Sequence, residues 1–212
     1  VRVGFFGTPD FALKFLKYLY ENNAEISFIV TQPASQSGRG KKINPSPVEK
    51  WGLEKKLKVY SPVKVNESNF QKDIKKQKVD FMIVVAYGNL IDEFIINFPK
   101  FLTINVHASL LPKWRGAAPI QRSILNDDKE TGICIMKVEK KLDAGPIIKL
   151  EKIKINYDDS RLSLSAINPG EFLKSNNNLF LYDNSAAGAI DIYTSVLGSD
   201  STEVSGTGNI AY

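Results

Sequence analysis

The sequence predicts an α/β protein with a doubly wound, mostly parallel sheet, followed by a short irregular or β-rich tail. Three observations lead to this fold class. The chain opens with an apolar strand, a Gly-Thr-Pro-Asp turn, an amphipathic helix and a second strand. Residues 80–87 (DFMIVVAY) form a nearly continuous apolar run, which is typical of a central parallel strand covered on both faces. Strands and helices then alternate along most of the chain.

Apolar residues at helical or alternating spacing give each element in order. The first helix, over residues 11–19, is expected to be capped by Thr8 or Asp10. Further helices are expected at residues 48–56, 67–76, 91–98 and 117–126. Strands are expected at residues 1–6, 26–31, 58–60, 80–87, 102–107, 131–138 and 147–155.

Residues 32–48 interrupt this alternation and predict a long polar loop. Loops of this length inside a compact domain usually carry function, and Arg and Lys suit contacts to phosphates. The alternative is a solvated, mobile loop. Pro45 and Pro47 would stiffen the return of the chain.

Composition narrows the class of protein. A hydrophobic fraction of 43% supports a sizeable core, no apolar run is long enough to span a membrane, and no secretory signal is recognisable. Cys134 is the only cysteine, so we expect a buried thiol in a cytoplasmic protein. The net charge of +5 divides into +9 for residues 1–174 and −4 for residues 175–212. A basic body suits a polyanion such as nucleic acid, although codon bias would give the same composition.

Two polar side chains share one face of the predicted strand at residues 102–107. Its period of two puts Asn105 and His107 together, opposite Ile104 and Val106. His107 is the only histidine of the chain. A lone histidine is commonly a core residue bonded to a backbone carbonyl, but the neighbouring Asn and the SLLP turn favour chemistry here. Asp143 lies in a turn after a later strand, where it is either part of the same site or a turn aspartate that caps Gly145.

Nine short motifs, in the same order over residues 1 to about 160, resemble the methionyl-tRNA formyltransferase family. The wider folate-dependent formyltransferases share the Asn-x-His, SLLP and Asp-containing elements, whereas GRGKK and WRGAAPIQ favour the tRNA family. The motifs are GTPDFA (7–12), TQP (31–33), GRGKK (38–42), PSPV (45–48), VVAYG (84–88), NVHASLLP (105–112), WRGAAPIQ (114–121), ETG (130–132) and LDAG (142–145).

The resemblance implies that residues 1–160 form a catalytic domain with the Rossmann-like formyltransferase fold. The implied reaction moves a formyl group from 10-formyltetrahydrofolate to the methionyl amine of initiator tRNA, in a monomer that needs no metal. By the same resemblance, Asn105, His107 and Asp143 are catalytic. The implied folate-binding residues are Ser109, Leu110, Leu111, Pro112, Ala86, Tyr87, Gly88 and Leu90, and the implied tRNA-binding residues are Arg39, Lys41 and Lys42.

This chemistry suits the three implied catalytic residues. Formyl transfer to an amine passes through a tetrahedral oxyanion, which Asn105 and His107 could stabilise by about 2.7–4 kcal/mol each. Asp143 could orient His107, favour its protonated form and relay a proton from the attacking amine through water.

Residues 161–212 do not continue the match and are predicted to be an atypical tail, disordered or chimeric. Family members instead continue into a β-barrel domain that helps to hold tRNA. Two alternatives therefore stand beside the main interpretation. One is formyl transfer to a small amine such as an amino sugar, and the other is an inactive, folate-binding remnant.

Overall fold

The computed structural model describes residues 1–37 and 42–155 of the chain. Within this part the chain divides into two compact units. The N-terminal unit comprises Arg2–Ile104, and the C-terminal unit comprises the residues from Asn105 onward together with Val1. The predicted tail, residues 161–212, lies outside the described residues.

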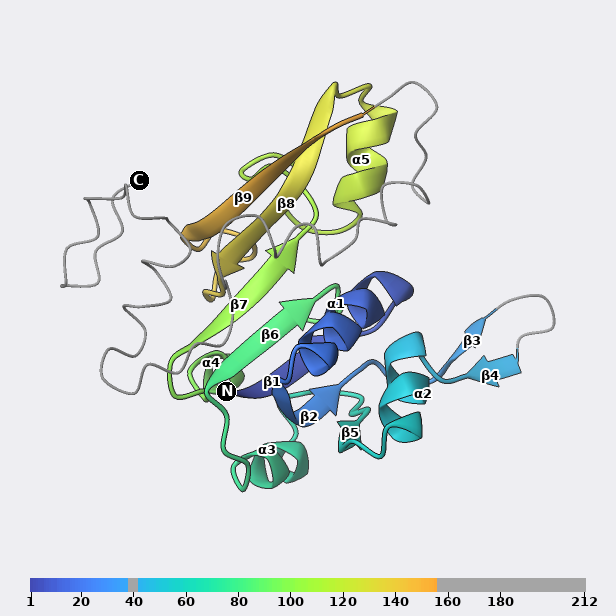
Figure 1. Ribbon diagram of the computed structural model, residues 1–212, viewed down its shortest axis with the longest axis vertical. Coiled ribbons are helices and arrows are strands. Elements are labelled where there is room, and N and C mark those ends of the chain that lie inside the picture. The colour runs from blue at the N-terminus through green and yellow to red at the C-terminus, as the bar shows by residue number, and fades with distance from the viewer. Residues whose placement is uncertain (38–41, 156–212) are drawn as a thin grey trace. The chain divides into compact units, whose positions relative to one another are not determined.

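Parallel strands form the centre of the N-terminal unit (Figure 1). They are β1 (Arg2–Gly7), β2 (Glu25–Val30), β5 (Val59–Tyr60) and β6 (Phe81–Val85). β1 lies between β2 and β6, and β5 pairs with the outer edge of β2, all in parallel. All five residues of β6 are buried, as the uninterrupted apolar run predicts for a central strand.

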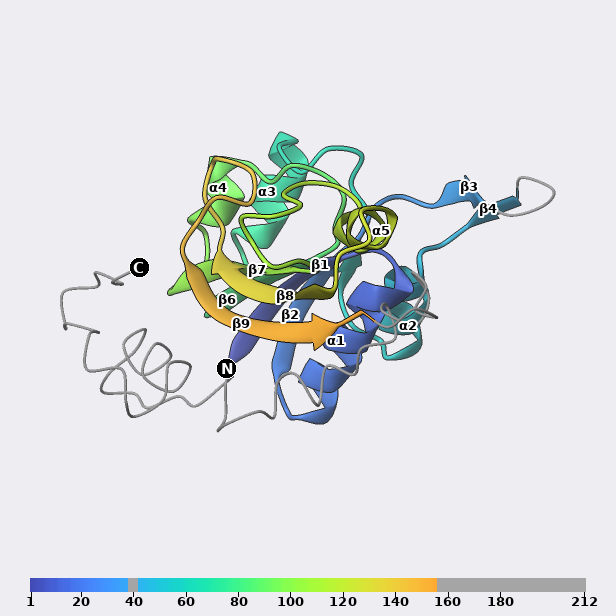
Figure 2. The same ribbon diagram turned by 90° about the horizontal axis from the view of Figure 1, so that it is seen from above.

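Helices cover both faces of these strands. Figure 2 shows α1 (Asp10–Glu21) and α2 (Pro47–Glu54) on one face, and α3 (Ser68–Ile74) and α4 (Glu93–Ile96) on the other. The doubly wound arrangement is therefore confirmed. α1 and α2 each bury apolar residues at helical spacing, as the sequence predicts.

The predicted cap of α1 is wrong. Pro9 occupies the N-cap position, and no side chain caps the helix. The hydroxyl of Thr8 instead donates to the carbonyl of Tyr87 at 2.9 Å. Thr8 therefore connects the turn after β1 to the end of β6, a contact between residues 79 positions apart.

The segment predicted as a polar loop contains a short antiparallel hairpin. Its strands are β3 (Ser35–Ser37) and β4 (Lys42–Asn44), with Ser35 opposite Asn44. The side chain of Ser46 then caps α2 by accepting from the backbone N–H of Glu49 at 2.9 Å. The hairpin tip, residues 38–41, lies outside the described residues.

The C-terminal unit is built around an antiparallel pair. β7 (Leu102–His107) begins in the N-terminal unit and ends in the C-terminal one. It is followed by α5 (Pro119–Leu125), β8 (Glu130–Lys137) and β9 (Ile147–Lys154), and β8 pairs antiparallel with β9. A Cβ at Gly132 would collide with the carbonyl oxygen of Glu151, so this close pairing requires glycine.

The described strands form a seven-stranded sheet in the order β5-β2-β1-β6-β7-β8-β9. The predicted α/β class with a mostly parallel sheet is confirmed, and the pair of β8 with β9 is antiparallel. None of the helices in residues 1–37 and 42–155 combines the length and the apolar composition needed to cross a membrane.

An ion pair at the start of β1 makes the stability of the N-terminal unit sensitive to acid. Asp80 accepts from Arg2 Nη2 at 2.7 Å, from Arg2 Nε at 3.1 Å and from the Arg2 backbone N–H at 2.8 Å. The hydrogen bonds from Arg2 lower the pKa of Asp80 despite its burial. The folded state therefore gains stability above the unfolded pKa of about 3.9 and loses it as the pH falls through the lower, folded pKa.

We expect Asp80→Asn to lower the free energy of unfolding by about 1–2 kcal/mol at pH 7, allowing for the partial exposure of Arg2. The difference from the unsubstituted chain should shrink as the pH falls below the unfolded pKa of about 3.9 and through the lower, folded pKa of Asp80. Denaturant titrations over a pH series measure both effects. Asp73→Asn is the control, since Asp73 is half exposed in its pair with Lys76 and should contribute less than about 0.5 kcal/mol. An equal loss for both variants would contradict the prediction.

Candidate active site

The structure brings Asn105, His107 and Asp143 together in the C-terminal unit. Asn105 Nδ2 donates to Asp143 Oδ1 at 3.2 Å, and His107 Nδ1 lies 3.5 Å from Asp143 Oδ2. The side chains of His107 and Asp143 are only 7% and 10% exposed. The two residues of β7 therefore share one face, as their spacing predicts, and that face meets the loop between β8 and β9.

The second ring nitrogen of His107 has a different partner. Its Nε2 lies 3.0 Å from the carbonyl oxygen of Trp114. A carbonyl only accepts, so Nε2 must carry a proton, and Nδ1 is the nitrogen that faces Asp143. One nitrogen thus has the backbone partner of an ordinary core histidine, while the other faces a carboxylate.

Asp143 also receives a backbone donor. The N–H of Gly116 donates to Asp143 Oδ2 at 2.8 Å, and Gly116 has a φ of 84°, a conformation that favours glycine. The hydrogen bonds of the Asp143 carboxylate thus go to Asn105 and Gly116, which differs from the simple turn role at Gly145. The carboxylate links β7, the loop after β7, and the loop before β9.

The SLLP segment follows β7, and two of its side chains point inward. Ser109 is fully buried and donates to the carbonyl of Lys113 at 2.6 Å. Leu111 packs against Cys134 and Met136, and its N–H donates to Cys134 Sγ at 3.4 Å. Leu110 is half-buried and Pro112 is exposed.

The other predicted folate segment follows β6 in the N-terminal unit. Ala86 and Gly88 have φ values of 45° and 91°. The ring of Tyr87 is buried edge-on against Phe6, and burial raises the pKa of its hydroxyl. Leu90, by contrast, is 76% exposed. This loop therefore presents an apolar side chain to solvent beside two residues with left-handed backbone.

Of the predicted tRNA-binding residues, Arg39 and Lys41 lie outside the described residues. Lys42 is the first residue of β4. The sequence also gave no prominence to Trp114 and Asp128. Trp114 lies in the WRGAAPIQ motif, but its contact with His107 is made through the backbone carbonyl, which carries no side-chain signal. Asp128 follows Asn126 and Asp127, a combination that indicates only a turn.

No group of three or more His, Cys, Asp or Glu side chains suited to a metal ion occurs among the residues that the structure describes.

Comparison with known proteins identifies the family. The family model described as "Formyl transferase" matches residues 1–167 of the chain. The chain belongs to this family. Methionyl-tRNA formyltransferase of Sulfurihydrogenibium sp. (strain YO3AOP1) is 48% identical to this protein over 165 residues, which are 77% of the chain and 53% of the relative. The enzyme of that name from Dictyoglomus thermophilum is 49% identical over 166 residues, 78% of the chain and 53% of the relative. The chain thus spans about half the length of these curated relatives.

Solved structures share the fold of this chain. Phosphoribosylglycinamide formyltransferase of Bacillus halodurans aligns with a TM-score of 0.64 and 20% identity, covering 85% of this chain and all of the other. A formyltetrahydrofolate deformylase of Pseudomonas syringae aligns with a TM-score of 0.59 and 19% identity, covering 75% and 52% of the two chains. At such identities the likeness concerns the fold alone.

Cys134 offers a test of how firmly the SLLP segment is held. Its thiol is fully buried, and burial raises its pKa. Because the thiolate is the reactive species, we expect native Cys134 to resist alkylation by iodoacetamide at pH 8 and to react rapidly in denaturant. Mass spectrometry of timed samples measures both rates on the only cysteine of the chain. Rapid labelling of the folded chain would show that Leu111 does not cover the thiol.

Proposed function

We propose that the chain transfers a formyl group from 10-formyltetrahydrofolate to the α-amine of methionine on initiator tRNA, with residues 1–160 as the catalytic domain. The observation that carries this proposal is the meeting of Asn105, His107 and Asp143 in a chain 48% identical to a methionyl-tRNA formyltransferase. Asparagine, histidine and aspartate can together stabilise an oxyanion and move a proton, which formyl transfer requires.

The reaction replaces one carbon–nitrogen bond with another. The amine nitrogen attacks the formyl carbon, and the carbonyl oxygen becomes an oxyanion in a tetrahedral intermediate. The bond between this carbon and the folate nitrogen then breaks, and the oxyanion returns to a carbonyl. The proton lost by the amine is balanced by the one gained by the folate nitrogen.

Asn105 supplies a neutral donor for the oxyanion. Its amide nitrogen carries two hydrogens, and the bond to Asp143 uses one of them. The second can therefore point to the developing oxyanion while the first fixes the side chain. Such a donor typically contributes about 2.7–4 kcal/mol to stabilising the transition state.

His107 can donate to the oxyanion only in its protonated form. Nε2–H is held by the carbonyl of Trp114, so the ring reaches the reacting groups through Nδ1. In the neutral ring, Nδ1 is an acceptor, and protonation converts it to a donor. Asp143 at 3.5 Å supplies the negative charge that balances this imidazolium, and through water it relays the proton of the attacking amine.

We assign folate contacts to residues 109–112 and, as a separate assignment, to residues 86–90. Because the side chains of Ser109 and Leu111 point inward, backbone groups and the side chains of Leu110 and Pro112 are left for this contact. The exposed Leu90 offers apolar surface to a ring system. We assign Arg39, Lys41 and Lys42 to phosphates of the tRNA acceptor end, where cations position the nucleic acid without reading its sequence.

The direct test is formyl transfer from 10-formyltetrahydrofolate to methionyl initiator tRNA, with a folate-binding titration on the same sample. Transfer above background supports the proposal. Folate binding without transfer to tRNA would contradict it and favour the folate-binding alternative. Transfer to an amino sugar with no transfer to tRNA would favour the small-amine alternative.

His107→Ala should lower kcat for formyl transfer by at least about 100-fold and leave the Kd for folate nearly unchanged. The substitution removes the only imidazole, which we place at the reacting groups and not in the folate site. His107→Gln controls for packing, since an amide can still donate to the Trp114 carbonyl but cannot take up a proton. It should therefore be similarly inactive, and near-normal kcat in either variant would remove the proposed role.

Arg39→Ala should raise the KM for tRNA by about 10-fold, reduce the salt dependence of that KM and leave folate affinity unchanged, because one phosphate contact is lost. Steady-state kinetics at several salt concentrations measure these effects. Lys72→Ala is the control, since this exposed residue of α3 also removes one positive charge. Equal losses in both variants would indicate a general charge effect, and a parallel loss of folate affinity would indicate a structural loop.

A further inference from the structure

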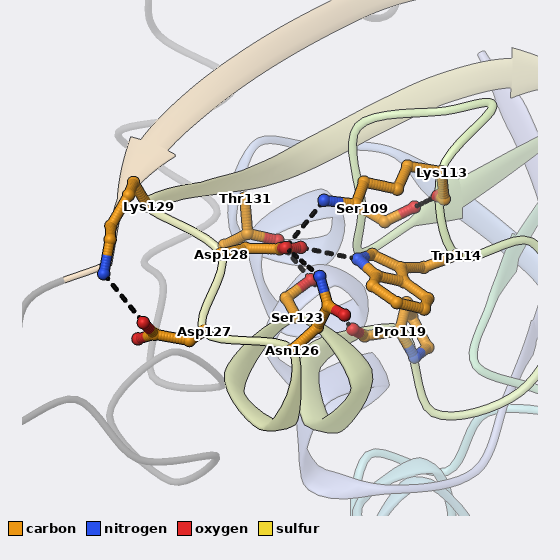
Figure 3. Close-up of polar contacts among 10 residues, drawn as sticks. All are labelled: Ser109, Lys113, Trp114, Pro119, Ser123, Asn126, Asp127, Asp128, Lys129 and Thr131. Carbon is orange, nitrogen blue, oxygen red and sulfur yellow. Dashed lines mark hydrogen bonds and ion pairs between the residues drawn. The ribbon is translucent and has the colours of Figure 1, made fainter.

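A buried carboxylate outside the proposed catalytic cluster collects three donors. The side chain of Asp128 is 5% exposed. Its Oδ1 accepts from Lys113 Nζ at 2.6 Å and from Asn126 Nδ2 at 2.7 Å, and its Oδ2 accepts from the indole Nε1 of Trp114 at 2.7 Å (Figure 3). A buried charge is tolerated only with such partners, so this arrangement fixes the carboxylate.

The residues beneath Asp128 hold its backbone. The N–H of Asp128 donates to the carbonyl of Ser123 at 3.0 Å. The buried hydroxyl of Ser123 in turn bonds to the carbonyl of Pro119 at 3.0 Å and to the hydroxyl of Thr131 at 3.2 Å (Figure 3). α5 and the start of β8 therefore form a fixed base for the Asp128 carboxylate.

Trp114 transmits this position to His107. Its φ of 60° lies in the left-handed region, which is unusual for a bulky residue and persists only where contacts enforce it. The indole is held by Asp128, and the backbone carbonyl of Trp114 accepts from His107 Nε2 at 3.0 Å. The indole and the carbonyl belong to one residue, so fixing the indole fixes the direction of the carbonyl.

The preceding residue is held in the same way. Ser109 donates to the carbonyl of Lys113, whose ammonium group pairs with Asp128 and lies 5.3 Å from the centre of the Trp114 ring. Asp128 thus holds the side chains of two consecutive residues, of which the second contacts His107.

We propose that Asp128 is a positioning residue that, through the indole of Trp114, holds the Trp114 carbonyl against Nε2 of His107 and so directs Nδ1 toward Asp143 and the reacting groups. The effect of Asp128 on catalysis rests on the proposed formyl transfer. Its effect on the orientation of the His107 ring does not depend on that proposal. Hydrogen bonding outweighs burial and keeps the pKa of Asp128 below its usual range, so the carboxylate is anionic at neutral pH.

The test uses His107 as a reporter, because it is the only histidine of the chain. In the 212-residue chain labelled with ¹⁵N in the imidazole ring, the chemical shifts of the two ring nitrogens at about pH 8, where imidazole is ordinarily neutral, show which one carries the proton. Steady-state formyl transfer and folate titration on each variant then separate kcat from binding.

Three variants isolate the contact. Asp128→Asn keeps the shape but has only one acceptor oxygen, which the ammonium group of Lys113 attracts, so the NH2 group of the amide is left to face the indole N–H. Trp114→Phe removes that N–H and leaves the pair of Lys113 with Asp128. Asp127→Asn is the matched control: it makes the same chemical change one residue away, where Asp127 is 90% exposed and pairs only with the exposed Lys129 among the described contacts (Figure 3).

We expect the proton to reside on Nε2 in the unsubstituted chain and in Asp127→Asn. In Asp128→Asn and Trp114→Phe it should be shared between Nε2 and Nδ1, with kcat lowered by up to about 100-fold and folate Kd unchanged. The double variant should resemble the worse single one, because both substitutions break the same link. Trp114→Phe keeps the test decisive if Asp128→Asn does not fold.

Unchanged chemical shifts of the His107 ring nitrogens in both Asp128→Asn and Trp114→Phe would overturn the proposal. Changes of the same size in Asp127→Asn would also overturn it. The two proposals can fail separately. If the unsubstituted chain transfers no formyl group but Asp128→Asn and Trp114→Phe still redistribute the ring proton, the positioning role is supported and the proposed reaction is refuted.

Discussion

The candidate active site depends on the contacts of one group, the carboxylate of Asp143. It lies nearly out of solvent, where an ionised group is stable only with donors around it. Those donors come from the side chain of Asn105 and the backbone of Gly116, and the ring of His107 faces the same group. Three segments distant in sequence therefore have their positions set by one side chain, and displacement of any of them would leave a buried charge short of partners.

The loop after β7 has a defined shape because contacts enforce an unusual backbone. Trp114, Gly116 and Ala118 all have φ values between 56° and 84°. For the two non-glycine residues, this conformation costs about 1–2 kcal/mol each. Every second residue is nevertheless held: Trp114 by His107 and Asp128, Gly116 by Asp143, and Ala118 by the N–H of Arg122, which donates to its carbonyl in the first turn of α5. The strain is thus repaid by contacts that converge on the site.

Periodicity was sufficient to predict the order along the chain of the helices and of the strands in the seven-stranded sheet, and the shared face of Asn105 and His107, because both follow from which residues can be buried. It was not sufficient for contacts that depend on tertiary structure. Threonine is a residue type that often caps helices, but once β1 and β6 pair, the hydroxyl of Thr8 bonds to the carbonyl of Tyr87 and not to the start of α1. The strands around Ser35 and Asn44 lack the apolar alternation that indicates a hairpin. The left-handed backbone at Trp114 could not be predicted, because no glycine marks the position. The role of Asp128 depends on tertiary neighbours that bury its side chain, which the local sequence does not indicate.

The alternation of β7 limits how the chain can vary in length. Its six residues place Asn105 and His107 on one face and Ile104 and Val106 on the other. Inserting or deleting a single residue within this strand would exchange the two faces and send the amide and imidazole away from Asp143. The segment from Ser35 to Asn44 carries no such restriction, because its sequence is mostly polar and has no alternating apolar residues to exchange. Length differences between related proteins should therefore collect in segments like the hairpin, while β7 keeps a constant count.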